Sequence, residues 1–188
     1  SDEGREYTHM LQMPRVYPAV MMGKANGGIL EMRTFNGIVL LSIGGLYGED
    51  EVRLVKQVVQ LLPMTLAAFA GSSGRSVKIL VRVEPAVGLM PSDTDSATVF
   101  YQNAYEQVSL IYQSVIPFKL MPVDKSMLTP MNASFRMTLD EAPYVNMHAV
   151  ALKVAETALL RKICNNRLTV VATTQSDNEK TVGKETKD

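Results

Sequence analysis

The most informative stretch of this sequence is Gly71-Ser72-Ser73-Gly74-Arg75-Ser76-Val77-Lys78-Ile79-Leu80-Val81-Arg82-Val83. Its last seven residues alternate strictly, so the β-branched residues share one face of a predicted strand and Lys78 and Arg82 lie on the other. The Gly and Ser residues before the strand form a turn whose backbone N–H groups, with the neighbouring cations, suit a phosphate. A tight turn before a core strand with two solvated cations explains the same pattern, so both interpretations stay open.

The segments around this stretch predict an α+β domain. Asn36-Gly37 is a strong hairpin signal, so residues 29–35 are expected to pair with the apolar run 38–43, which is typical of a central strand buried on both faces. Apolar residues at helical spacing predict a helix over 49–62. Further strands are expected at 65–70, 134–139 and 168–173, and further helices at about 95–116 and 148–163.

Strands and helices alternate along the chain, with hairpins among them. This order predicts a mixed or antiparallel central sheet with helices packed mostly on one face. In the helix at about 95–116, Asp95 or Ser96 is expected to be the N-cap. The apolar stripe of this helix is expected at Phe100, Ala104, Val108, Ile111 and Val115.

The composition predicts one domain without a strong net electrostatic field. The chain has 188 residues, of which 46% are hydrophobic, and this is enough for one buried core. Lys plus Arg and Asp plus Glu number 19 each, so any anion binding must come from local clustering. A single cysteine, Cys164, fits a reducing, cytoplasmic compartment, and with only His9 and His148 it cannot build a zinc site.

The two ends of the chain are expected to lie outside the domain. Residues 1–12 predict a flexible N-terminus, residues 13–173 a single domain, and the polar tract 174–188 a disordered tail or a linker. No apolar run approaches the roughly 20 residues of a membrane span, and the polar N-terminus is unlike a signal peptide. We therefore expect no membrane association.

Acidic residues offer only weak candidates for metal ligation. Asp140 beside Glu141 is half of a possible metal pair, but a capped turn explains it equally well. The run Glu49-Asp50-Glu51 is better explained by its place in the first turn of a helix, where acids complement the dipole. Gly71–Gly74 lacks the Gly-Lys-Ser/Thr end of a nucleotide-binding P-loop. Residue types alone therefore define no catalytic site.

Four blocks follow one another in an order that resembles a known family. They are residues 14–19, 36–41, 66–79 and 135–146. Over about residues 12–160 the chain resembles the VirE-like N-terminal domain of large bacterial mobile-element proteins, where it precedes helicase-like or primase-associated regions. That family is similar to the catalytic core of archaeo-eukaryotic primases and primase-polymerases, which implies a primase-polymerase-like fold with an RRM-like core.

The resemblance implies a site that has lost its metal ligands. Primase-polymerases of this kind place an Asp-x-Asp pair at the end of the first central strand, where two carboxylates hold the divalent ions. Here the corresponding residues are Ser42-Ile43-Gly44, and Lys78 stands where the family has a histidine. Asp140 is the acid nearest to the third motif. Since Ser42 and Gly44 cannot replace two carboxylates, no metal and no cofactor are expected.

The leading hypothesis is a catalytically degenerate domain that binds nucleic acid, with DNA favoured, or docks a partner within a mobile-element replication or transfer protein. A helicase-like region in the same or a partner chain is the expected companion. The residues expected to contact phosphate are Lys78, Arg82, Arg75, Ser72 and Ser73, with Arg136 from a neighbouring strand.

Two other functions stay open. An active DNA primase or nucleotidyltransferase would recruit carboxylates from elsewhere, such as Asp140, Glu141 or Asp124, and would need Mg²⁺ or Mn²⁺. A protein-interaction module would pair the same cations with acidic partners and would bind no nucleic acid.

Overall fold

The computed structural model of the chain describes residues 3–5 and 12–155. Residues 3–5 are helical, and the described residues up to Val154 belong to one structural unit. The other elements, in chain order, are β1 (Arg15–Val16), β2 (Val20–Lys24), β3 (Leu30–Phe35), β4 (Ile38–Ile43), α2 (Glu49–Val59), β5 (Thr65–Ala70), β6 (Val77–Pro85), α3 (Thr94–Val115), the 3-10 helix η1 (Lys125–Met127), β7 (Phe135–Arg136), β8 (Tyr144–Val145) and β9 (Leu152–Val154).

Strand β6 forms the centre of a five-stranded sheet. It pairs antiparallel with β4 on one side and with β5 on the other, and β8 continues the sheet beyond β5. The alternation predicted from the sequence is confirmed, because Val77, Ile79 and Val81 are fully buried. Lys78 and Arg82 therefore lie on the opposite face of the sheet.

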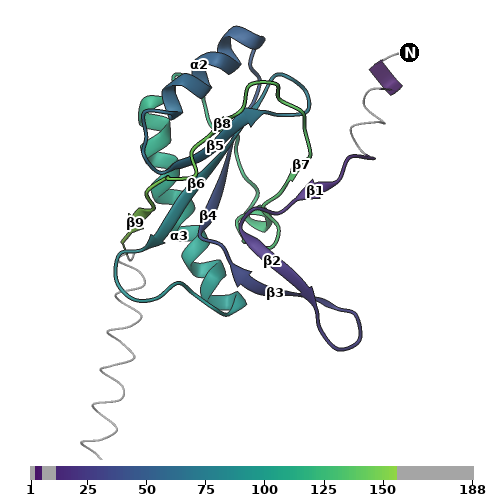
Figure 1. Cartoon of the computed structure of the whole chain (residues 1–188), viewed down its shortest axis with the longest axis vertical. Coiled ribbons are helices and arrows are strands. Elements are labelled where there is room, and N and C mark those ends of the chain that lie inside the picture. Colours follow the sequence, from purple (N-terminus) through teal and green to yellow (C-terminus); the bar gives the residue numbers. More distant parts are fainter. Residues whose placement is uncertain (1–2, 6–11, 156–188) are drawn as a thin grey trace, which may run out of the picture. The chain divides into compact units, whose positions relative to one another are not determined.

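Helices α2 and α3 lie on one side of this sheet (Figure 1). The valines of α2 at positions 52, 55 and 59 are buried, as their helical spacing predicts. They join the buried residues of β4, β6 and α3 in one hydrophobic cluster. The expected α+β class, with a mainly antiparallel sheet and helices on one face, is confirmed.

Helix α3 begins and packs slightly differently from the sequence prediction. Its N-cap is Asp93 rather than Asp95 or Ser96, and the Asp93 carboxylate accepts a hydrogen bond from the Ser96 N–H at 2.8 Å. Ala104 and Val108 of the expected stripe are buried, but Val115 is 42% exposed. Tyr101 and Tyr112 are buried instead, because their hydroxyls find partners in Leu40 N and Thr65 Oγ1.

The hairpin predicted at Asn36-Gly37 is wrong. β3 pairs with β2, and β4 lies at one edge of the five-stranded sheet instead of at its centre. Gly37 turns the chain between the two sheets with a φ of 67°, and its carbonyl accepts a hydrogen bond from Val83 N at 2.8 Å. A Cβ at Gly37 would lie 2.7 Å from the Val83 carbonyl oxygen, so the positive φ and the close approach to the β6 backbone both require glycine here.

The C-terminal part of the described chain also departs from the prediction. Of the helix expected at 148–163, residues 148–155 contain β9, which pairs in parallel with the end of β6. Val154 is buried there, and its carbonyl accepts a hydrogen bond from Ala86 N at 2.9 Å, so strand pairing outweighs the helical pattern. The expected strand over 134–139 is reduced to β7. Residues 156–163, the strand expected at 168–173 and the tail at 174–188 lie outside the described residues.

The outer edge of β4 is covered by α3 and by the chain that follows it. The Tyr101 hydroxyl accepts a hydrogen bond from Leu40 N at 3.3 Å, and Met121 N donates to the Ser42 carbonyl at 2.9 Å. Ile43 forms an isolated antiparallel bridge with Leu120. The order β4-α2-β5-β6-α3-Leu120 therefore has the βαββαβ arrangement, with β6 between the parallel β4 and β5.

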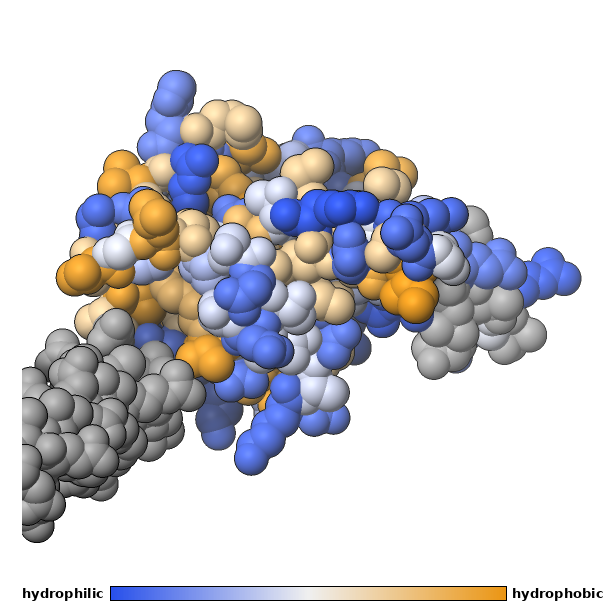
Figure 2. Space-filling view, turned by 90° about the horizontal axis from the view of Figure 1, so that it is seen from below, coloured by the Kyte–Doolittle hydropathy of each residue, from blue (hydrophilic) through white to orange (hydrophobic). Residues whose placement is uncertain are grey.

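Hydrophobic side chains are exposed at several separate places on this unit. Leu89, in the loop after β6, is 93% exposed, and Ile29, next to β3, is 71% exposed. Seen from below, hydrophobic side chains alternate with hydrophilic ones over this end of the molecule (Figure 2). Among residues 3–5 and 12–155, no helix combines the length and the apolar character needed to cross a membrane.

Candidate functional site

A cleft of about 880 Å³ lies on the sheet face opposite the hydrophobic core. Its floor includes Leu40 and Ser42 of β4 and Lys78 of β6, the side chains that the strand alternation directs away from the core. Its walls come from residues 44–45, 72–73, 75–76, 121–124, 127 and 133–136, together with Arg15, Tyr101 and Tyr105. We call this hollow the cleft.

Four cationic side chains from four separate segments line the cleft. They are Arg15 of β1, Arg75 of the turn before β6, Lys78 of β6 and Arg136 of β7. The β1–β7 ladder places Arg15 directly opposite Arg136, and Arg15 Nη1 also donates to Ser134 Oγ at 2.8 Å. The lining contains one carboxylate, Asp124, so the cleft has an excess of three positive charges.

Lys78 is a partly buried member of the candidate phosphate contacts. It is the register partner of Ser42, and its Nζ donates to Ser42 Oγ at 3.0 Å. Burial first, and then the positive charge of Arg15, lower the pKa of the Lys78 ammonium below its ordinary value of 10.5. Loss of solvation and the positive charge of Arg15 thus both disfavour the charged form of Lys78. An anion bound in the cleft would favour the charged form of Lys78.

The turn before β6 presents Ser72, Ser73 and Arg75 to the cleft. Gly71 N donates to the Ser76 carbonyl at 2.8 Å, and Gly74 takes a φ of 70°, which favours glycine. Arg75 is tied to the loop after β4, because its Nε donates to the Leu46 carbonyl at 2.8 Å and Leu46 N donates to the Arg75 carbonyl at 3.0 Å. These bonds fix the turn beside Lys78.

Ser42 and Gly44, the positions where the sequence analysis expected lost metal ligands, also line the cleft. Ser42 faces Lys78, and Gly44 lies so close to Met121 that a Cβ there would be 2.7 Å from its sulfur. Asp124 caps η1, because its side chain accepts a hydrogen bond from Ser126 N at 3.2 Å. Within residues 3–5 and 12–155, no group of three or more His, Cys, Asp or Glu side chains could hold a metal ion.

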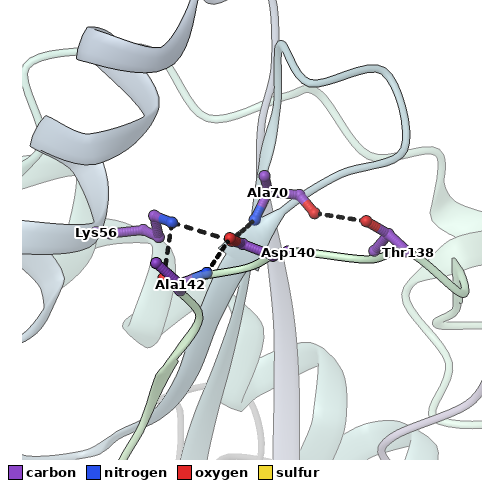
Figure 3. Close-up of polar contacts among 5 residues, drawn as sticks. All are labelled: Lys56, Ala70, Thr138, Asp140 and Ala142. Atoms are coloured by element: carbon purple, nitrogen blue, oxygen red, sulfur yellow. Dashed lines mark hydrogen bonds and ion pairs between the residues drawn. The ribbon is translucent and has the colours of Figure 1, made fainter.

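Asp140 does not line the cleft but forms a structural junction (Figure 3). Its Oδ2 accepts hydrogen bonds from Ala70 N at 2.7 Å and from Lys56 Nζ at 3.0 Å, and its Oδ1 accepts one from Ala142 N at 3.0 Å. Thr138 Oγ1 donates to the Ala70 carbonyl at 2.9 Å. Burial opposes ionisation, but the hydrogen bonds from Ala70, Ala142 and Lys56 outweigh it and lower the pKa of Asp140.

Arg82 lies apart from the cleft, although it shares a strand face with Lys78. Its Nη1 donates to the Ala149 carbonyl at 3.1 Å, and it lines a different hollow of about 350 Å³ together with Asn36 and Glu84. Four residues along a strand separate it from Lys78, a distance of about 13 Å. Of the six residues expected to contact phosphate, the cleft therefore gathers five and leaves out Arg82.

Arg15 and Tyr105 line the cleft and were missed by the sequence prediction. Arg15 lies in the extended segment between Pro14 and Pro18, but its place over β6 depends on the pairing of β1 with β7. Tyr105 follows Tyr101 by one helical turn, with the two rings stacked at 6.5 Å. The spacing of these tyrosines was the signal available in the sequence, and Arg15 had no local signal.

The fold and the cleft together define an α+β domain with a cationic hollow on its helix-free sheet face. The chain belongs to the family described as BT4734-like, N-terminal domain, whose model matches residues 8–144. Neither the curated proteins nor the solved structures contain a match to this chain.

Proposed function

We propose that this domain binds nucleic acid through backbone phosphates held in the cleft. The observation that supports this proposal is the convergence of Arg15, Arg75, Lys78 and Arg136 on one hollow whose lining has a single carboxylate. A chain with equal numbers of acids and bases has no net charge to concentrate anions, so binding depends on this local cluster. DNA is the favoured ligand.

The more specific proposal is a catalytically degenerate primase-polymerase-like domain of the VirE-like group, acting in the cytoplasm within a mobile-element replication or transfer protein. The βαββαβ order of its elements is consistent with an RRM-like core. Ser42 and Gly44, where the metal-binding pair would stand, lie in the same cleft as Lys78. A helicase-like region in the same or a partner chain would supply the enzymatic function.

A specific residue favours the active-enzyme alternative. Asp124 does line the cleft, whereas Asp140 is occupied by Lys56 and two backbone N–H groups. In-line phosphoryl transfer usually needs two carboxylates to hold the divalent ions. A primer-synthesis assay with Mg²⁺ or Mn²⁺ decides between the two, and template-dependent products that disappear in Asp124→Asn would establish the enzyme.

The binding proposal is tested by fluorescence anisotropy with labelled single- and double-stranded DNA and RNA across a range of salt concentrations. Affinity should fall as salt rises, with a slope of about 0.7 to 0.9 log units per log unit of salt for each phosphate neutralised. If none of these probes binds at low salt, the domain is a protein-interaction module and the proposal is wrong.

A further inference from the structure

A second hollow, of about 660 Å³, adjoins the cleft. It lies between the outer side of α3 and residues 120–128, which follow this helix. Tyr105 lines both hollows. On the helix its lining residues include Gln102, Glu106, Leu110 and Gln113, which are three or four positions apart and so share one face. We call this second hollow the α3 groove.

The α3 groove is preformed and mostly apolar. Leu110 on the helix is 70% exposed, and Leu120 and Leu128 form the opposite wall. Gln113 fixes the two walls to each other, because its Nε2 donates to the Phe118 carbonyl at 2.8 Å and its Oε1 accepts from Leu120 N at 2.9 Å. Both hollows have volumes within the range of small-ligand sites, about 300 to 1,000 Å³.

The charges of the two hollows differ. The lining of the α3 groove contains one acid, Glu106, and one base, Lys125, whereas the cleft has an excess of three positive charges. The groove therefore has no net positive charge to attract a phosphate. A flat apolar ring with polar edges suits it, because the leucines can cover the ring and Gln102 and Glu106 offer hydrogen-bonding groups.

We propose that the α3 groove holds a nucleobase of a single-stranded nucleic acid whose phosphates lie in the cleft, with Tyr105 between the two. This inference rests on the function proposed for the cleft. Bases of a duplex are paired and stacked, so a base reaches such a groove only from a single strand. Tyr105 supplies an aromatic face of the kind on which single-stranded bases stack without sequence preference.

The test compares two probes that share phosphates and differ in bases. One is oligothymidylate of about 12 nucleotides, the upper part of the range of single-strand site sizes. The other is an abasic oligomer of equal length. The protein should bind oligothymidylate about 5- to 150-fold more tightly than the abasic strand, because stacking of a base on an aromatic ring is worth about 1 to 3 kcal/mol.

Variants at Tyr105 assign that difference to the groove. Tyr105→Ala should reduce the ratio of the two affinities to near one, whereas Tyr105→Phe should keep the wild-type preference. Leu110→Glu provides a second variant at an exposed position, and Leu61→Glu is its matched control, because Leu61 is 81% exposed on the α2–β5 connection, outside both hollows.

The outcomes separate the two proposals. Equal wild-type affinity for both oligomers, or an unchanged preference in both Tyr105→Ala and Leu110→Glu, overturns the base site but leaves phosphate binding in the cleft intact. If neither oligomer binds at low salt, the function proposed for the cleft is wrong, and so is the base site that depends on it. A base preference lost in both variants and kept in Tyr105→Phe and Leu61→Glu supports the base site.

Discussion

The Asp140 junction and the cleft contain the same kinds of charged group in opposite arrangements. At the junction one lysine meets one carboxylate, both side chains are nearly buried at 13% and 10% exposure, and backbone N–H groups complete the set. The lining of the cleft, in contrast, contains four cationic side chains and one carboxylate. The lysine of the junction is neutralised within the protein, but Lys78 has a serine and an arginine beside it.

Under the proposed function, this difference separates a group that stabilises the fold from groups that would bind a ligand. A buried pair with every partner present is costly to break, because removing one charge leaves the other without compensation. A cluster of like charges lowers stability, and proteins keep such clusters where binding benefits from them. The contrast predicts that substitutions in the two regions affect different properties.

Asp140→Asn should have the largest effect, and it should act on stability. Loss of the charge leaves Lys56 unpaired and places an amide among N–H donors, so the free energy of unfolding should fall by about 3 kcal/mol or more. Chemical denaturation measures this fall. Glu141→Gln, at the neighbouring acid, should change stability by about 0.5 kcal/mol at most.

The same variant tests whether Asp140 is structural or catalytic. At temperatures where Asp140→Asn is folded, its affinity for DNA should equal that of the wild type. Full stability combined with lost affinity or lost primer synthesis would contradict the structural role of Asp140 and would favour the active-enzyme alternative.

Charge reversal in the cleft should have the next largest effect, and it should act on binding. The double variant Arg15→Glu/Lys78→Glu should weaken single-stranded DNA binding on the order of 100-fold at low salt and reduce the salt slope by about 0.7 per lost contact. Arg82→Glu is the matched control on the same face of β6 and should change affinity far less. Equal losses in the two variants would show that the cleft is not the binding surface.

The dependence of stability on pH should follow Asp140. Its pKa is lowered in the folded protein, so its contribution is fully present above the unfolded-state value of 3.8 and is lost as pH falls through the lower folded-state value. Urea denaturation between neutral pH and pH 2 should therefore show a steeper loss of stability below about pH 4 in the wild type than in Asp140→Asn. Parallel curves would mean that another group controls the acid transition.

Lys78→Met should have the smallest effect, and in the stabilising direction. Burial and Arg15 lower the pKa of Lys78 because both disfavour its charged form, so an apolar chain of similar length should raise the melting temperature by about 2 °C. Scanning calorimetry measures this change, and DNA affinity should fall in the same protein. A clear loss of stability would show that the Lys78–Ser42 hydrogen bond stabilises the fold by more than the burial of the Lys78 charge destabilises it.

Local patterns predicted the part of the fold that local physics controls. The alternation of β6 and the helical spacing of α2 follow from the burial of every second or every third to fourth residue, and both were correct. The hairpin at Asn36-Gly37 was wrong because β2 competes for β3, and the helix at 148–155 was wrong because β6 offers a strand edge to β9. Neither of these pairings, β2 with β3 or β6 with β9, can be inferred from the few residues around each predicted element.

The site was predictable to a similar degree. Ser72, Ser73, Arg75 and Lys78 are close in sequence, so one motif identified them together. Arg15 could not be found, because it reaches the cleft through a pairing with a strand near Ser134, 119 residues away. Arg82 lies outside the cleft, because alternation gives the face of a strand and not the extent of a hollow along it.

The central claim is that the cleft on β4 and β6 holds the phosphates of a nucleic acid. The most direct test is an NMR titration of the labelled protein with a short oligothymidylate, following backbone amides and the side-chain signals of Lys and Arg. The signals of Ser42, Ser73, Arg75 and Lys78 should shift together and saturate, while those of Arg53 on α2 stay unchanged. Shifts centred on α2, or no saturable shift in the cleft, would contradict the claim.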